Sequence, residues 1–145
     1  MPYLTVQFAS AGPLIDLLVG VSQPREHALL KNSMPVPNPV QVRGLIDTGA
    51  SCTCIDPEII SSLSLAPTGT TTMLTPSTGI VPHECNQYDV GITLMHPEFP
   101  FSFQALPVIE AKLKHQGFQA LIGRDVLANC LLVYDGRHGS YTLAF

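Results

Sequence analysis

Leu45-Ile46-Asp47-Thr48-Gly49-Ala50-Ser51 sets a carboxylate between an apolar strand and a tight glycine turn. Apolar residues recur from Val40 to Ile46 and predict a strand that enters the core and ends at Asp47. The small residues that follow allow another segment of backbone to approach closely. This stretch alone leaves two interpretations open. Asp47 is either an ordinary turn residue that accepts backbone hydrogen bonds, or a carboxylate presented for catalysis.

A second apolar strand that ends in glycine lies at Ala120-Leu121-Ile122-Gly123, and Arg124 opens a short helix after it. With both segments in this order, the chain resembles the retropepsin-like aspartic proteases. In that family a hydrophobic-hydrophobic-Gly motif crosses beside the Asp-Thr-Gly loop and leads into a short helix. The resemblance follows the order of elements from Leu4 to Phe145, and residues 45–51 and 120–127 match at the level of motifs.

The resemblance implies an all-β fold: a closed acid-protease barrel with two short helices and one lobe per chain. The 145 residues, 46% of them hydrophobic, are enough for one domain spanning residues 1–145. An N-terminal hairpin is expected from residues 4–10 and 14–19, followed by a Pro-rich loop over 22–39 with at most one helical turn. Asp56 and Pro57 predict the start of a helix that ends at Leu65 or Ala66. The other strands are expected at residues 40–47, 88–94, 101–109, 120–122, 131–134 and 141–145.

Aspartic proteolysis needs two carboxylates close enough to share one proton, because like charges at that distance cannot both ionise cheaply. The chain offers one candidate, Asp47, and is too short for a two-lobed arrangement. The second carboxylate must therefore come from another copy across a two-fold interface, which predicts a homodimer. One carboxylate would deprotonate a water that attacks the peptide carbonyl, while its partner protonates the carbonyl oxygen.

The family's pattern gives roles to the residues around Asp47. Thr48 would hydrogen-bond across the dimer axis, while Gly49 and Ala50 would form the tight turn that leaves room for substrate. Leu121, Ile122 and Gly123 would support the loop from behind. Arg124 would brace it, although the acidic partner usual in the family is replaced by Ser51, with Cys52 next to it. Ser51, backbone carbonyls and another carboxylate all remain possible partners for Arg124.

Residues 68–90 predict a polar hairpin in the position where the family carries a flap that closes over substrate. The candidates for its tip are Thr75, Pro76, Ser77, Thr78 and Gly79. Substrate would be a peptide or protein lying extended between flap and floor, with apolar residues beside the scissile bond. An ordinary surface hairpin is the alternative interpretation.

Composition excludes several other partners. The net charge of −4 and the lack of a Lys/Arg cluster argue against nucleic acid and against an anionic membrane surface. Residues 1–20 lack a basic start, and Asp16 interrupts their apolar run, so neither a signal peptide nor a membrane span is expected. Four cysteines without a secretion signal favour reduced thiols in the cytoplasm. Only 12% of residues are charged, which is compatible with an apolar surface that faces a partner.

Three other functional classes compete with the protease. A zinc site would draw on the cysteines, but a C-x-C pair on a strand points to opposite faces, so no metal and no cofactor are expected. A Ser or Cys hydrolase would use Ser51 or Cys52, but neither has a convincing partner histidine, since His83 and His96 are expected in loops. A catalytically silent dimerisation or peptide-binding module with the retropepsin fold is the strongest alternative.

Overall fold

The computed structural model describes residues 1–75 and 79–145, and six of its strands close into a barrel. Neighbouring strands are hydrogen-bonded, and the circle closes where β2 pairs with β6. Their order is β2 (Leu14–Val21), β3 (Val40–Ile46), β8 (Ala120–Ile122), β4 (Cys54–Ile55), β7 (Phe101–Glu110) and β6 (His83–Leu94). A seventh strand, β5 (Gly69–Met73), pairs with β6 and forms the expected hairpin. The predicted closed, mostly β architecture is confirmed.

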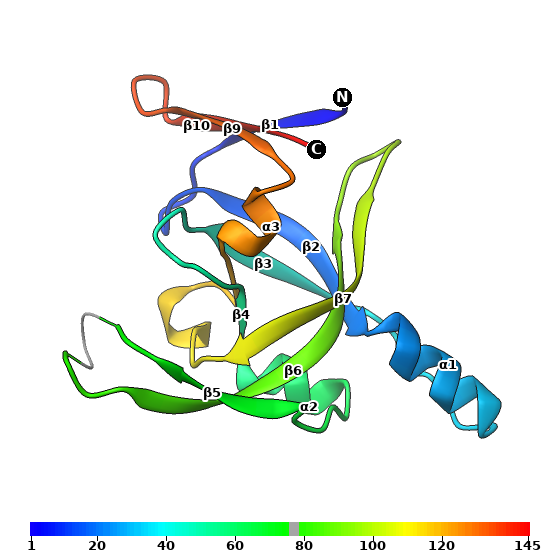
Figure 1. Ribbon diagram of the computed structural model, residues 1–145. Helices are drawn as coiled ribbons and strands as arrows, with labels where there is room; N and C mark the ends of the chain where they lie inside the picture. The colour runs from blue at the N-terminus through cyan, green and yellow to red at the C-terminus, as the bar shows by residue number, and fades with distance from the viewer. Residues whose placement is uncertain (76–78) are drawn as a thin grey trace.

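The two termini form a separate sheet of three strands at one end of the barrel (Figure 1). Its order is β1 (Tyr3–Gln7), β10 (Ser140–Ala144) and β9 (Leu131–Asp135). The predicted C-terminal hairpin is therefore confirmed, but the predicted N-terminal hairpin is wrong. Strand β1 pairs with β10, and a bridge between Ala9 and Gly12 joins the segments on either side of the first turn. Alternation in residues 4–10 predicted the strand but not its partner. The partner is β10, which is distant in the sequence and whose Tyr141 is completely buried.

The described residues form three α-helices where two were expected: α1 (Gln23–Lys31), α2 (Pro57–Ser62) and α3 (Arg124–Leu127). A 3-10 turn, η1, spans Lys114–Gln116. The additional helix, α1, lies in the Pro-rich segment and projects away from the body (Figure 1). The Ser22 side chain caps it by accepting from the Arg25 amide, and Leu29 is its one buried residue. Proline suits the first turn of a helix, so Pro24 opens α1 rather than excluding it.

Helix α2 starts as predicted, with Asp56 as its N-cap, and ends earlier than expected, at Ser62. The strand before it, β4, was missed because it is only two residues long. That short strand pairs with both β7 and β8, so it joins two sides of the barrel.

The two sequence motifs meet where β3 and β8 run parallel to each other. Leu45 pairs with Leu121, and Ile46 pairs with Ile122. Both strands therefore end at the same edge, and Asp47 and Gly123 follow them there. Among the described residues, no helix is both long and apolar enough to cross a membrane.

Candidate active site

Asp47 lies in a turn whose backbone is fixed from two directions. The Asp47 amide donates to the carbonyl oxygen of Ile122 at 3.0 Å, which continues the β3–β8 pairing into the loop. The Gly49 amide donates to Oδ1 of Asp47 at 2.8 Å, and the Ala50 amide donates to its carbonyl oxygen at 3.2 Å. These last two bonds are those of an ordinary Asp turn. The Asp47 turn differs from an ordinary turn in the contacts that residues 122–125 make with the loop.

Gly123 allows the loop to pack directly against β8. A Cβ at this position would lie 2.5 Å from the carbonyl carbon of Cys52 and 2.6 Å from its oxygen. Any side chain would therefore push the segment after Asp47 away from β8. The supporting role predicted for Gly123 is compatible with this close approach, and Ile122 contacts the loop through the carbonyl oxygen that accepts the Asp47 amide.

Arg124 reaches the backbone of the same loop. Its guanidinium Nη1 donates to the carbonyl oxygen of Thr48 at 2.9 Å, and its amide donates to that of Ala50 at 2.9 Å. Of the partners left open by the sequence, backbone carbonyls are thus the ones found. No ion pair of the described residues includes Arg124. Thr48 and Gly49 are exposed at the tip of the turn.

Asp125 supplies a carboxylate that the sequence had not singled out. Its Oδ1 accepts from the Thr53 hydroxyl at 2.8 Å, and its Oδ2 accepts from the Thr53 amide at 2.9 Å. Thr53 is completely buried, and its Oγ1 also accepts from the Gly123 amide at 3.2 Å. The loop after Asp47 is thereby tied to the start of α3 by a closed polar network. An acidic residue in the first turn of a helix was the available signal, but it predicts capping just as well.

A cavity of about 590 Å³ opens beside Asp47. Gly49, Ala50, Ser51 and Cys52 line it on the loop side, and Leu74 and Thr75 face it from the β5–β6 hairpin. The hairpin thus stands over the candidate catalytic residue. Of the proposed tip residues, Thr75 lines the cavity and Gly79 has a positive φ of 62°, while Pro76, Ser77 and Thr78 lie outside the described residues.

Two thiols in this cavity are poor nucleophiles. Burial raises the pKa of Cys54 to about 12 and also raises the pKa of Cys52. Both are therefore protonated near neutral pH, which disfavours cysteine catalysis. Within the described residues, no group of three or more His, Cys, Asp and Glu side chains is placed to hold a metal ion. His96 accepts two backbone amides of its own turn through Nδ1, whereas His83, expected in a loop, is the first residue of β6.

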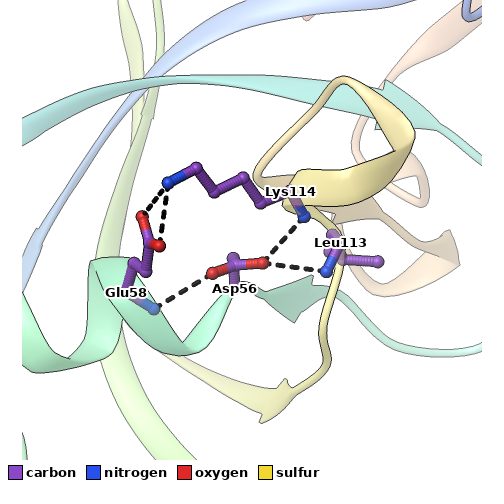
Figure 2. Close-up of polar contacts among 4 residues, drawn as sticks. All are labelled: Asp56, Glu58, Leu113 and Lys114. Carbon is purple, nitrogen blue, oxygen red and sulfur yellow. Dashed lines mark hydrogen bonds and ion pairs between the residues drawn. The ribbon is translucent and has the colours of Figure 1, made fainter.

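Asp56 joins the start of α2 to the segment at Leu113 and Lys114 (Figure 2). Besides capping α2 through the Glu58 amide at 3.0 Å, its Oδ2 accepts the amides of Leu113 and Lys114, each at 2.8 Å. Lys114 in turn pairs with the exposed Glu58 carboxylate at 2.8 Å. Burial alone would raise the pKa of Asp56, but the three backbone donors outweigh it, and the pKa is lowered. The sequence predicted the cap but not the link to Leu113, which lines the Asp47 cavity.

The comparisons with known proteins identify the fold. No family model matches the chain, and no curated protein matches its sequence. Among solved structures, a retropepsin-like aspartic protease from Rickettsia conorii matches with a TM-score of 0.59 and 14% identity, over 98% of this chain and 89% of that one. The retroviral protease-like domain of Ddi1 from Leishmania major has a TM-score of 0.41 and 15% identity, over 87% of this chain and 84% of that one. The fold expected from the two sequence motifs, a retropepsin-like barrel, is confirmed.

Proposed function

We propose that this chain is a single-domain aspartic endopeptidase that acts as a homodimer, with one Asp47 from each copy. The observation that carries the proposal is the Asp47 turn. Its backbone is held by Ile122 and Arg124, and its carboxylate lines a cavity beneath a hairpin. This arrangement gives a half-buried carboxylate a fixed position and leaves room beside it for a peptide.

In the dimer, the two Asp47 carboxyls share one proton and bind one water between them. Two like charges this close repel each other, so one carboxyl is ionised and acts as a base while the other keeps the shared proton and acts as an acid. The base takes a proton from water as the oxygen attacks the peptide carbonyl, and the acid donates a proton to the carbonyl oxygen. Thr48 is exposed at the tip of the turn, and in the proposed dimer it would contact its symmetry mate.

The surface proposed for dimerisation is the outer edge of β9. This strand has a hydrogen-bonded neighbour on one side, β10. Leu131 and Val133 lie on the outer face of the sheet and are 58% and 52% exposed. An edge strand with exposed apolar side chains tends to pair with another strand. Strand β9 also follows directly from α3, which supports the Asp47 loop, so pairing through β9 would bring the two loops toward a common axis.

Substrate would lie extended in the cavity, with the β5–β6 hairpin closing over it and excluding water. Apolar side chains beside the scissile bond would contact Leu74 and Leu121. We place the enzyme in a reducing compartment, the cytoplasm, because its four cysteines are all free thiols.

The direct test is cleavage of a peptide library near pH 5 by the wild type and by Asp47→Asn. The proposal expects cleavage by the wild type and a loss of at least about a thousandfold in the variant, which cannot form the dyad. Equal activity in the two proteins would exclude the protease. Peptide binding without cleavage by the wild type would favour the silent binding module instead.

A further inference from the structure

The Asp47 cavity continues into a second cavity of about 700 Å³. Met73, Thr75, Ala111 and Lys112 line both, so the two form one groove beneath the β5–β6 hairpin. The inner half, next to Asp47, is lined mostly by apolar and small side chains. The outer half adds Glu84, Asn86 and Glu110 to its lining. An extended peptide that reaches both halves therefore meets two different chemistries.

Glu110 is held in place at the end of β7. Its Oε2 is 3.3 Å from the Asn86 amide nitrogen and 3.5 Å from the Tyr88 hydroxyl, both of which donate to it from β6. Tyr88 is 5% exposed, so its position is fixed by the core. A carboxylate oriented in this way loses little side-chain entropy when it binds a cation.

No ion pair of the described residues includes Glu110. The ion pairs of the described residues are Asp16–Arg43, Glu58–Lys114 and Asp135–His138, and none of them involves the groove. Besides two carboxylates, the outer half is lined by His83 and Lys112. Burial raises the pKa of the Cys85 thiol, and the Glu110 charge raises it further. The Glu110 carboxylate is thus close enough to Cys85, which also lines the outer half, to act on it electrostatically.

We propose that Glu110 is a specificity-determining residue that selects a lysine or arginine side chain of the substrate in the outer half of the groove. This inference rests on the proposed function. The substrate class is a peptide with apolar residues at the scissile bond and a basic residue farther along, where the groove reaches Glu110. Side chains of an extended peptide alternate in direction, so residues an even number of positions apart lie on the same face. The basic residue is expected on the same face as the apolar residue that fills the inner half.

The test uses a cleavable peptide in which each position outside the scissile pair is replaced in turn by Lys, Gln or Glu. At one position, the wild type should cleave the Lys peptide about fivefold better in kcat/KM than the Gln peptide, as a partly exposed ion pair allows. Glu110→Gln should remove this preference through KM, with kcat unchanged, because the contact is remote from the reacting atoms. Glu98→Gln, an exposed acid outside both cavities, is the matched control and should keep the preference.

Binding of the same peptides to Asp47→Asn separates this inference from the proposed function. If no peptide is cleaved in an Asp47-dependent manner, the proposed function fails, and the ratio of Kd values for Lys and Gln peptides still tests Glu110. Three results would overturn the inference: no basic preference in the wild type, the same preference in Glu110→Gln, or a preference for the Glu peptide. The last would mean that Lys112 dominates the groove. Thermal unfolding of Glu110→Gln checks that the variant is folded.

Discussion

Asp125 accepts both the backbone amide and the hydroxyl of Thr53, at 2.9 and 2.8 Å, and so ties the first turn of α3 to the segment that follows Asp47. The two residues are 72 positions apart in the chain. The link stands beside the Arg124 contact to Thr48, so a carboxylate and a guanidinium from consecutive residues hold opposite ends of one loop. The loop after Asp47 is therefore fixed by polar contacts that do not depend on Ser51.

Asp125→Ala should destabilise the protein by about 2 kcal/mol, because it leaves the buried amide and hydroxyl of Thr53 without an acceptor. Urea unfolding measures this loss. Asp125→Asn keeps one acceptor oxygen and should lose less. Equal stability of the alanine variant and the wild type would show that this network does not support the loop.

Gly123→Ala should cost about 3 kcal/mol or more and greatly reduce the amount of folded protein. The added Cβ would lie 2.5 Å from the Cys52 backbone, which cannot move without displacing the Asp47 loop. Gly69→Ala is the matched control. A Cβ at Gly69 has no neighbour within 4 Å, and its unfolding free energy should stay within about 0.5 kcal/mol of the wild type. Similar losses in both variants would contradict the close approach at Gly123.

Asp56 should make stability depend on acid pH. Its pKa in the folded protein is below the ordinary value of 3.8, so it stabilises the fold above that pH and loses this contribution as the pH falls through the lowered pKa. Asp56→Asn does not titrate, and its single amide oxygen cannot accept the Glu58 amide as well as the Leu113 and Lys114 amides. The difference in unfolding free energy between wild type and variant should be about 2 kcal/mol at pH 7 and shrink below pH 3.8.

The control for this pH series is Glu58→Gln, which breaks the exposed pair with Lys114. The Glu58 and Lys114 side chains are each 65% exposed, and exposed ion pairs contribute less than about 1 kcal/mol to the free energy of unfolding. A constant difference between wild type and Asp56→Asn at every pH would contradict the assignment of the linkage to Asp56.

Lysines on the outer face of β9 should weaken the proposed dimer. Leu131→Lys combined with Val133→Lys places like charges opposite each other if two β9 edges pair, and should raise the dimer dissociation constant at least about tenfold. Sedimentation equilibrium measures the change. Tyr3→Lys, on the same face but on the other edge strand, is the control and should dimerise like the wild type. The opposite pattern would move the interface to β1.

Local patterns in the sequence predicted the parts of the fold that local chemistry determines. The strand before Asp47, the Gly123 strand and the Asp56 cap all have their cause within a few residues. The partner of β1 could not be predicted in this way, since alternation in residues 4–10 fits any neighbour with an apolar face. Helix α1 was expected as at most one turn, because Pro24 and the three prolines at positions 35, 37 and 39 were given more weight than the Ser22 cap.

The same distinction between local and distant contacts applies to the candidate active site. Asp47 and its turn were predicted from seven consecutive residues, and Arg124 from its place after Gly123. Thr53 carried no signal, because its importance comes from burial and from the distant Asp125. Glu110 could not be identified from the sequence either. Its proposed role in the groove depends on Asn86 and Tyr88, which the β6–β7 register places beside it.

The most direct test of the central claim, that two Asp47 side chains from two chains make one active site, is peptide cleavage by mixtures of wild type and Asp47→Asn. The two proteins are unfolded together and refolded at constant total concentration, so that subunits combine at random. If each site needs both carboxylates, activity should fall as the square of the wild-type fraction, to about a quarter in an equal mixture. Activity that falls in proportion to the wild-type fraction would mean that each chain acts alone, and would contradict the account.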